Sequence, residues 1–251
     1  MRKNTRWFWP FLLCFFLLGR TAPAGAAGDI LSRLYENSES VAHIHVEASM
    51  LVNNPAKSGS AGSLRVRGIR AAKINKTGGA IVLDASGILV TNAHIVYKGA
   101  RITAGFEEGE RLPCTVLAVA PEEDLAFLRV DAGRPLRPVT LTQPAPVRLN
   151  DVVYTIGGSE TLKDTISQGK VTGLGRKRFA SKGNISEVDM IQVSFNIYEG
   201  DSGSPLFDKN GQLLGIMTAS LKKTGHASYA IPSEIIRETF KRLISDRSIS
   251  S

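Results

Sequence analysis

Short apolar runs recur along most of the chain and are separated by turn-forming residues. Residues 41–47 alternate apolar and polar side chains, and residues 80–83 and 88–91 flank an Asp-Ala-Ser-Gly turn. Residues 206–207 and 213–216 flank Asp-Lys-Asn-Gly, whose Asn-Gly pair suits a tight hairpin. Runs of this length and spacing predict antiparallel β-strands that close into barrels.

Three segments depart from this strand pattern. Residues 29–40 are rich in polar side chains and predict a short helix or an irregular lead-in, while the polar and small residues 52–63 predict an exposed loop. A last helix is predicted to begin at Ser233, a favourable N-cap residue. Its buried stripe comprises Ile235, Ile236, Phe240, Leu243 and Ile244. These patterns predict an all-β protein with a C-terminal helix.

A proline-rich connection divides the strands into two groups. We interpret it as the crossing between two six-stranded antiparallel β-barrels. The expected organisation is a signal peptide over residues 1–26, a lead-in with the first strand and an exposed loop over 27–77, the rest of the first barrel over 78–133, the connection over 134–146, the second barrel over 147–232, and a helix with its tail over 233–251.

The N-terminal residues have the composition of an export signal. A basic start precedes an apolar run over residues 7–18, and two Ala-x-Ala sequences follow within residues 22–26. The apolar run has 12 residues and includes Pro10, whereas a membrane-spanning helix needs roughly 20. We therefore expect a signal cleaved between Ala24 and Gly28, in preference to an uncleaved anchor, and an exported protein that is periplasmic or secreted, without stable membrane insertion.

Removal of this signal changes both the charge and the cysteine content. Residues 1–26 carry four basic and no acidic side chains, so the net charge falls from +8 to +4. Much of that excess lies in residues 176–178 and 222–223, which favours solvated loops over a nucleic-acid partner. Cys114 remains as the only cysteine, which excludes an intramolecular disulfide despite the oxidising compartment.

Three motifs carry the groups needed for nucleophilic catalysis. Ser202 lies in Gly-Asp-Ser-Gly-Ser-Pro, and a serine hydroxyl becomes a nucleophile when a base takes its proton and donors await the oxyanion. His94 ends an apolar strand in Thr-Asn-Ala-His-Ile-Val, and Asp124 begins Asp-Leu-Ala-Phe-Leu. The order His, Asp, Ser is that of the chymotrypsin fold and differs from subtilisin and the α/β-hydrolases. Asp131 and Asp84 remain alternatives to Asp124.

From about residue 78 to 233, the sequence resembles a trypsin-like serine peptidase of the HtrA/Deg branch. The three motifs and several further short segments occur in the order expected for that family. These further segments are residues 77–82, 154–158, 169–171, 191–192, 215–219 and 229–233. The resemblance implies a chymotrypsin-like fold with His94 and Asp124 in the first barrel, Ser202 in the second, and the site in the cleft between them. The chain leaves no room for the PDZ domain that usually follows the protease domain in this branch.

The resemblance also implies roles for individual residues. Ser202 is the expected nucleophile, His94 the general base that later protonates the leaving amine, and Asp124 the group that orients His94. The backbone N–H groups of Gly200 and Ser202 are the expected oxyanion hole. The substrate pocket is expected to be lined by Asn196, Ile197, Met217, Thr218 and Ala219.

None of these pocket residues is acidic, which argues against a preference for Lys or Arg and favours small or medium aliphatic side chains. The serine motif also resembles that of glutamyl endopeptidases, but those place a histidine near the position of Met217. Asp201 and Ser204 stand where the HtrA branch usually has Asn and Gly. In trypsins this aspartate pairs with a freed N-terminus, and its partner here is left open. Tyr198 and Glu199 also depart from the family pattern.

We therefore expect an exported serine endopeptidase that acts on proteins or peptides and requires no cofactor. The alternative is a protease-fold binding module with weak or no catalysis, and a further rival is an incidental esterase activity. His43 and His45 share one strand face, but without a third ligand we expect a surface pair and no metal. The oligomeric state is left open.

Overall fold

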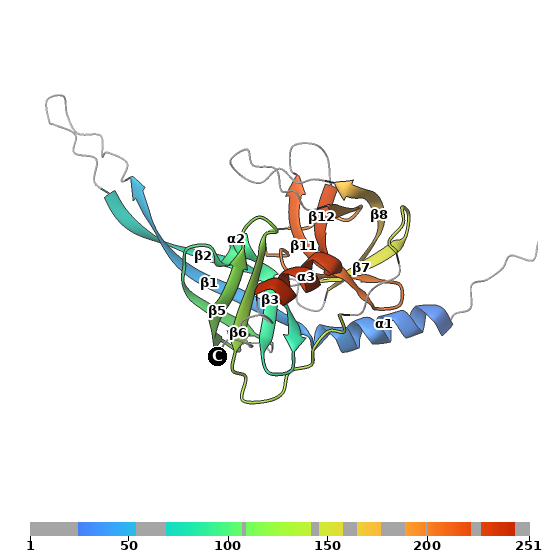
Figure 1. The fold of residues 1–251 in the computed structure, drawn as a ribbon, viewed down its shortest axis with the longest axis horizontal. Helices are drawn as coiled ribbons and strands as arrows, with labels where there is room; N and C mark the ends of the chain where they lie inside the picture. The colour runs from blue at the N-terminus through green and yellow to red at the C-terminus, as the bar shows by residue number, and fades with distance from the viewer. Residues whose placement is uncertain are drawn as a thin grey trace, which may run out of the picture.

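The computed structural model of the chain describes residues 25–53, 69–106, 109–141, 146–157, 165–176, 189–198, 200–221 and 227–243. Its strands form two closed six-stranded antiparallel barrels, shown side by side in Figure 1. This confirms the predicted all-β, chymotrypsin-like fold. The predicted signal peptide lies outside the described residues, apart from its last two positions, which begin the first helix.

The first barrel is formed by residues 41–130. Its strands are β1 (Val41–Asn53), β2 (Ile69–Asp84), β3 (Ile88–Asn92), β4 (Gly99–Gly105), β5 (Leu112–Ala120) and β6 (Leu125–Val130), hydrogen-bonded in the order β1-β2-β3-β6-β5-β4. Alternate residues of β1 face inward, so Ala42, Ile44 and Val46 are buried with Leu89 and Leu128 in the barrel interior.

β1 and β2 extend well beyond this barrel as a two-stranded arm (Figure 1). Their pairing runs from Val41 opposite Ile81 to Asn53 opposite Ile69, whereas β4 pairs with β1 only as far as Ala48. The strand therefore includes the first two positions of the loop that we expected over residues 52–63, and residues 54–68 lie outside the described residues. β2 also begins before the boundary expected at residue 78.

The second barrel is formed by residues 152–232. Its strands are β7 (Val152–Ile156), β8 (Ile166–Arg176), β9 (Met190–Val193), β10 (Pro205–Asp208), β11 (Leu213–Leu221) and β12 (Ala227–Pro232), in the order β10-β11-β12-β9-β8-β7. Its interior contains Val153, Val193, Leu206 and Met217. The proline-rich segment lies between β6 and β7, and so between the barrels.

In the described part of the chain, three helices accompany the barrels: α1 (Gly25–Ser38), α2 (Ala93–Val96) and α3 (Ser233–Leu243). In α3, Ile236 is buried and the Phe240 ring lies 5.5 Å from that of Phe127, which agrees with the predicted apolar stripe. The helix begins at Ser233 as predicted, but the buried Ser233 Oγ makes no capping hydrogen bond among the described residues, so its predicted role as N-cap is wrong. Ile244 lies outside the described residues. None of the described helices is long and apolar enough to cross a membrane.

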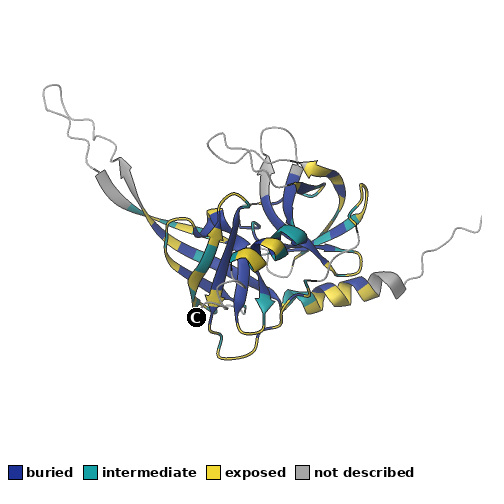
Figure 2. Ribbon diagram, in the orientation of Figure 1, coloured by how far each residue is buried: buried dark blue, intermediate teal, exposed yellow. Residues whose placement is uncertain are grey.

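A hydrophobic cluster between the barrels fixes their relative position. Ile81 and Phe127 of the first barrel pack with Phe207 and Ile216 of the second, and Leu34 of α1 joins them. All five are fully buried, and full burial of one such side chain contributes roughly 1.5–3 kcal/mol. Figure 2 shows the buried segments of the two barrels in dark blue. Residues that protrude from the facing ends of the two barrels are therefore held at a fixed spacing.

Candidate active site

His94 and Asp124 lie against one another at one end of the first barrel. His94 is in the single turn α2, which directly follows β3, and Asp124 immediately precedes β6. The Nδ1 atom of His94 lies 2.9 Å from Oδ2 and 3.0 Å from Oδ1 of Asp124. The His94 backbone N–H also donates to Oδ1, at 3.0 Å. The carboxylate therefore holds both the backbone and the ring of His94.

The main chain of Asp124 adds to this attachment. Its carbonyl oxygen accepts from the Ala93 backbone N–H at 3.0 Å and from Asn92 Nδ2 at 3.2 Å. Asp124 has a φ of 58°, a left-handed conformation that Asp tolerates better than most residues. It is buried, at 7% exposure, while the His94 side chain is 43% exposed. This arrangement leaves the outer edge of the imidazole accessible.

The two alternatives to Asp124 lie elsewhere. Asp84 Oδ1 accepts a hydrogen bond from the Ser86 backbone N–H at 2.6 Å, in the turn between β2 and β3. Asp131 Oδ1 accepts one from the Gly133 N–H at 3.0 Å, after β6. Both carboxylates serve local turns, so Asp124 is the one of the three that the structure brings to His94.

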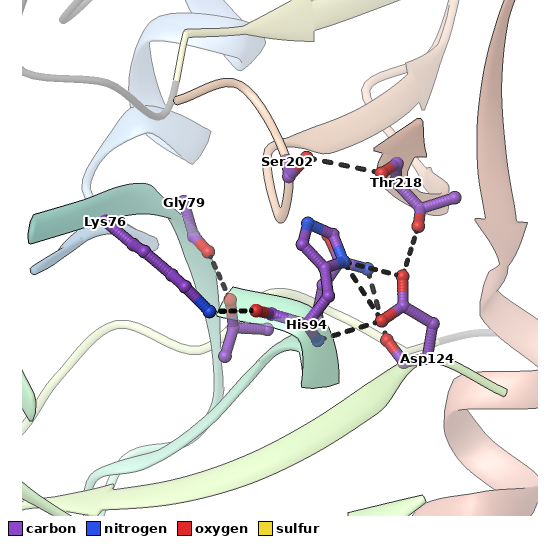
Figure 3. Close-up of polar contacts among 8 residues, drawn as sticks. Lys76, Gly79, His94, Asp124, Ser202 and Thr218 are labelled. Carbon is purple, nitrogen blue, oxygen red and sulfur yellow. Dashed lines mark hydrogen bonds and ion pairs between the residues drawn. The ribbon is translucent and has the colours of Figure 1, made fainter. Parts of the chain in front are cut away.

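Thr218 connects this pair to the second barrel (Figure 3). It lies on β11, is 2% exposed, and its Oγ1 donates a hydrogen bond to Asp124 Oδ2 at 2.5 Å. Its carbonyl oxygen accepts a hydrogen bond from Ser202 Oγ at 3.2 Å. Sequence analysis assigned Thr218 to the substrate pocket and missed this contact with the carboxylate. The hydroxyl at this position was the available signal, but only the register of β11 shows what it contacts.

Ser202 is half-buried and faces the outer edge of the His94 ring, as Figure 3 shows. Its hydroxyl is directed to Thr218, and among the described residues no hydrogen bond joins it to His94. The structure therefore brings His94, Asp124 and Ser202 to one place, with the serine hydroxyl turned to a backbone carbonyl.

The turn that carries Ser202 packs directly on β2 of the first barrel. The Gly79 N–H donates to the Ser202 carbonyl at 2.7 Å. A Cβ at Gly79 would lie 2.9 Å from Ser204 N, and one at Gly203, where φ is 88°, would lie 1.9 Å from Gly79 O. Glycine is required at both positions because two backbones approach closely there.

The two expected oxyanion donors are the backbone N–H groups of Gly200 and Ser202. Neither the Gly200 N–H nor the Ser202 N–H donates a hydrogen bond within the part of the chain that the structure describes. Gly200 has a φ of 101°, which favours glycine. The assignment of these two N–H groups to an oxyanion hole stays a prediction.

Asp201 is a buried carboxylate beside these donors, at 7% exposure. Its Oδ2 accepts a hydrogen bond from the Tyr198 N–H at 2.8 Å, while the buried Oδ1 has no hydrogen-bond partner among the described residues. Burial raises the pKa of Asp201 above its ordinary value, and the Tyr198 hydrogen bond opposes that change. Tyr198 is therefore the partner of one carboxylate oxygen of Asp201, and the other oxygen has none among the described residues.

The expected pocket residues are distributed between the surface and the core. Met217 and Ile197 pack inside the second barrel, at 0% and 7% exposure. Asn196 is exposed, and Ala219 lies on β11 opposite Tyr229, with its side chain outside the described residues. Of these residues, Thr218 is the one that a hydrogen bond joins to Ser202 within the described ranges, and it does so through its backbone carbonyl.

The histidine pair on β1 is not a surface pair, because His43 is only 6% exposed. Within the described ranges, no group of three or more His, Cys, Asp or Glu side chains is arranged to hold a metal ion. Cys114 is half-buried, and burial raises the pKa of its thiol to about 12.

Comparisons with known proteins agree with this geometry. Residues 77–216 match the trypsin-like peptidase domain family. "Serine protease HTRA2, mitochondrial" of Bos taurus is 34% identical over 165 residues, which is 66% of this chain and 36% of the relative. "Probable periplasmic serine endoprotease DegP-like" of Brucella suis is 31% identical over 176 residues, 68% of this chain and 34% of the relative.

A solved structure of the HtrA-type protease AlgW with a decapeptide is 26% identical, with a TM-score of 0.66, and the match covers 87% of this chain and 67% of that one. The chain spans about a third of the length of the curated relatives it matches. The family match extends over more than half of the chain, through the His94, Asp124 and Ser202 motifs. The chain therefore belongs to the family of trypsin-like peptidase domains, and its relatives include HtrA-type serine proteases.

Proposed function

We propose that this chain is an exported serine endopeptidase that hydrolyses protein or peptide bonds through Ser202, His94 and Asp124. The observation that supports it most is the buried Asp124 carboxylate, which holds both the ring and the backbone of His94 beside Ser202. A carboxylate in that position fixes the orientation of the imidazole and stabilises its protonated form.

In this mechanism His94 is the general base. Because the Asp124 carboxylate accepts hydrogen bonds, the proton of the neutral ring resides on Nδ1 and leaves Nε2 as the acceptor. Nε2 takes the proton of Ser202 Oγ as the oxygen attacks the substrate carbonyl, and later gives it to the leaving amine. Water then attacks the acyl-enzyme with His94 again as the base, and Asp124 stays ionised throughout.

The serine hydroxyl must first leave Thr218. Rotation about its χ1 bond exchanges the 3.2 Å hydrogen bond to the Thr218 carbonyl for one to His94 Nε2. The net free energy of a neutral hydrogen bond of this kind is about 1 kcal/mol, so substrate binding readily offsets the change. The N–H groups of Gly200 and Ser202 would then receive the oxyanion, and loss of one such donor typically costs about 100-fold or more in turnover.

The proposed substrate class rests on the family and on the side chains that the resemblance assigns to the substrate pocket. The relatives are serine proteases by name, and AlgW was solved with a decapeptide. None of the expected pocket residues is acidic or basic, so we propose cleavage after small or medium aliphatic residues. The export signal expected at the N-terminus agrees with the periplasmic assignment in the name of the Brucella relative.

A peptide library tests this proposal. Purified protein is incubated with the library beside a Ser202→Ala variant, and cleavage products are identified by mass spectrometry. We expect products that end in Ala, Val or Leu and that are absent from the variant. Cleavage dominated by Glu, Lys or Arg would contradict the proposed preference. A folded protein that cleaves no peptide would contradict the endopeptidase and favour the binding module.

A further inference from the structure

Lys76 lies on β2, and its ammonium group reaches the turn that carries His94. Its Nζ donates a hydrogen bond to the His94 carbonyl at 2.9 Å and another to the Tyr97 carbonyl at 3.2 Å. Figure 3 shows the extended side chain and its contact with the His94 carbonyl. Lys76 is half-buried, and burial lowers its pKa below the ordinary value of a lysine. Lys76 is thus bound to the turn that carries His94 and differs from a lysine whose ammonium group is surrounded by water.

Lys76 contacts two backbone carbonyl groups that have no N–H partner within the short helix α2. α2 has only four residues, and the Tyr97 N–H donates back to the Ala93 carbonyl. The carbonyls that follow in this turn have no further helical N–H to accept from. A cationic side chain at the C-terminal end of a helix satisfies such groups. Lys76 therefore bonds the carbonyl groups of this turn, whereas Asp124 bonds the His94 N–H group and ring.

The same stretch of β2 also contacts the nucleophile turn. Gly79, three residues after Lys76, donates its N–H to the Ser202 carbonyl at 2.7 Å. Residues three apart in a strand are separated by only about 10 Å. One short stretch of β2 therefore bonds the backbone of both His94 and Ser202, although these two residues belong to different barrels.

We propose that Lys76 is a positioning residue, which fixes the α2 turn so that the His94 ring faces Ser202. The proposal rests on the proposed function, in which His94 is the general base. Without the ammonium group, the two carbonyls lose their partner inside the protein, and the turn keeps only its contacts with Asp124 and the packing of its buried Ala93, Ile95 and Val96 side chains. A reacting group that moves by about 1 Å can lose on the order of 100-fold in rate, so a partial release of the turn lowers turnover more than substrate binding.

A kinetic comparison of three variants tests this role. Lys76→Met removes the donor and keeps the apolar stem, Lys76→Arg keeps a donor, and Lys73→Met removes an exposed lysine from the same strand as the matched control. We expect Lys76→Met to lower kcat about tenfold with KM changed less than twofold, and Lys76→Arg to recover most of the loss. An unchanged kcat in Lys76→Met, or an equal loss in Lys73→Met, would overturn the proposal.

A second readout does not depend on turnover. The imidazole 15N–1H correlation of His94, assigned by its disappearance in His94→Ala, is recorded in a Ser202→Ala background with and without each lysine substitution. We expect Lys76→Met to shift or broaden this signal while thermal unfolding stays cooperative, and Lys73→Met to leave it unchanged. An unaltered signal in Lys76→Met would contradict the inference. A shifted signal in a protein that hydrolyses nothing would support the inference and reject the proposed function alone.

Discussion

Thr218 Oγ1 lies 2.5 Å from Asp124 Oδ2 and donates a hydrogen bond to it across the boundary between the two barrels. Thr218 belongs to β11 of the second barrel, and Asp124 precedes β6 of the first. The carbonyl of the same threonine accepts the hydrogen bond of Ser202 Oγ. One residue of β11 thus contacts both the orienting carboxylate and the candidate nucleophile.

Replacement of Thr218 by Val tests the first of these contacts. The substitution keeps the shape of the side chain but removes the donor to a buried carboxylate, which typically costs about 1–3 kcal/mol of stability. We expect the Asp124 carboxylate to lose its fixed position and kcat to fall about tenfold. The measurements are urea unfolding and kcat on the best library peptide. Thr218→Ser, which keeps the donor, is the matched control, and equal kcat values in the two variants would contradict this account.

Gly79→Ala tests the contact between the barrels at the nucleophile turn. The new Cβ would lie 2.9 Å from Ser204 N and 3.0 Å from the Gly203 carbonyl carbon, and both are backbone atoms. Because neither can move without displacing the Ser202 turn, we expect a loss of stability of about 1–3 kcal/mol and a kcat at least tenfold lower.

The control for this variant is Gly109→Ala. Gly109 has a φ of 77° with open space around the new Cβ, so the substitution introduces backbone strain of about 1 kcal/mol away from the site. Its kcat should equal that of the parent chain. A Gly79→Ala protein with full activity would show that the nucleophile turn does not depend on this close approach.

Asp201 makes stability depend on pH in a defined direction. Burial raises its pKa above the ordinary value of 3.8, so the folded chain holds this proton to a higher pH than the unfolded chain does. Stability is therefore greatest below the ordinary pKa and falls as the pH rises through the raised one. Above that interval the folded protein contains a buried charge whose Oδ1 atom lacks a partner among the described residues.

Replacement of Asp201 by Asn removes this charge. At pH 7 we expect the variant to have a larger free energy of unfolding than the parent, on the order of 1 kcal/mol, and the difference to vanish as the pH falls toward 4. Urea unfolding at several pH values measures it, and Glu47→Gln, an exposed acid, is the control. A variant that is less stable than the parent at pH 7 would contradict the view that burial of this charge destabilises the folded protein.

The sequence predicted the barrels because strands and turns are encoded in local patterns, whereas the expected proximity of three residues came from the resemblance to chymotrypsin-like peptidases. Apolar runs with turn residues between them specify antiparallel strands, and the His94 and Ser202 motifs each occupy a few adjacent positions. Once the chymotrypsin-like order of the motifs was identified, the two-barrel fold placed these motifs together. Asp124 was harder to assign, because only the structure shows that its carboxylate contacts His94 while those of Asp84 and Asp131 accept hydrogen bonds within local turns.

The remaining features depend on contacts between distant positions. Thr218 is 94 residues from Asp124, and only the alignment of β11 with the first barrel reveals their hydrogen bond. Lys76 is 18 residues from His94, on a strand that composition alone did not extend to Ile69. His43 is buried by tertiary packing, and its alternation along β1 could not distinguish a solvent-facing position from a covered one.

Labelling of the protein with a fluorophosphonate probe tests the central claim most directly, because the probe reacts with a serine whose proton is taken by a neighbouring base. The parent chain, Ser202→Ala and His94→Ala are labelled side by side, with thermal unfolding as the check that each is folded. We predict stoichiometric labelling of the parent and none in either variant. A folded parent chain that the probe does not label, or one whose labelling persists in Ser202→Ala, would contradict an activated Ser202.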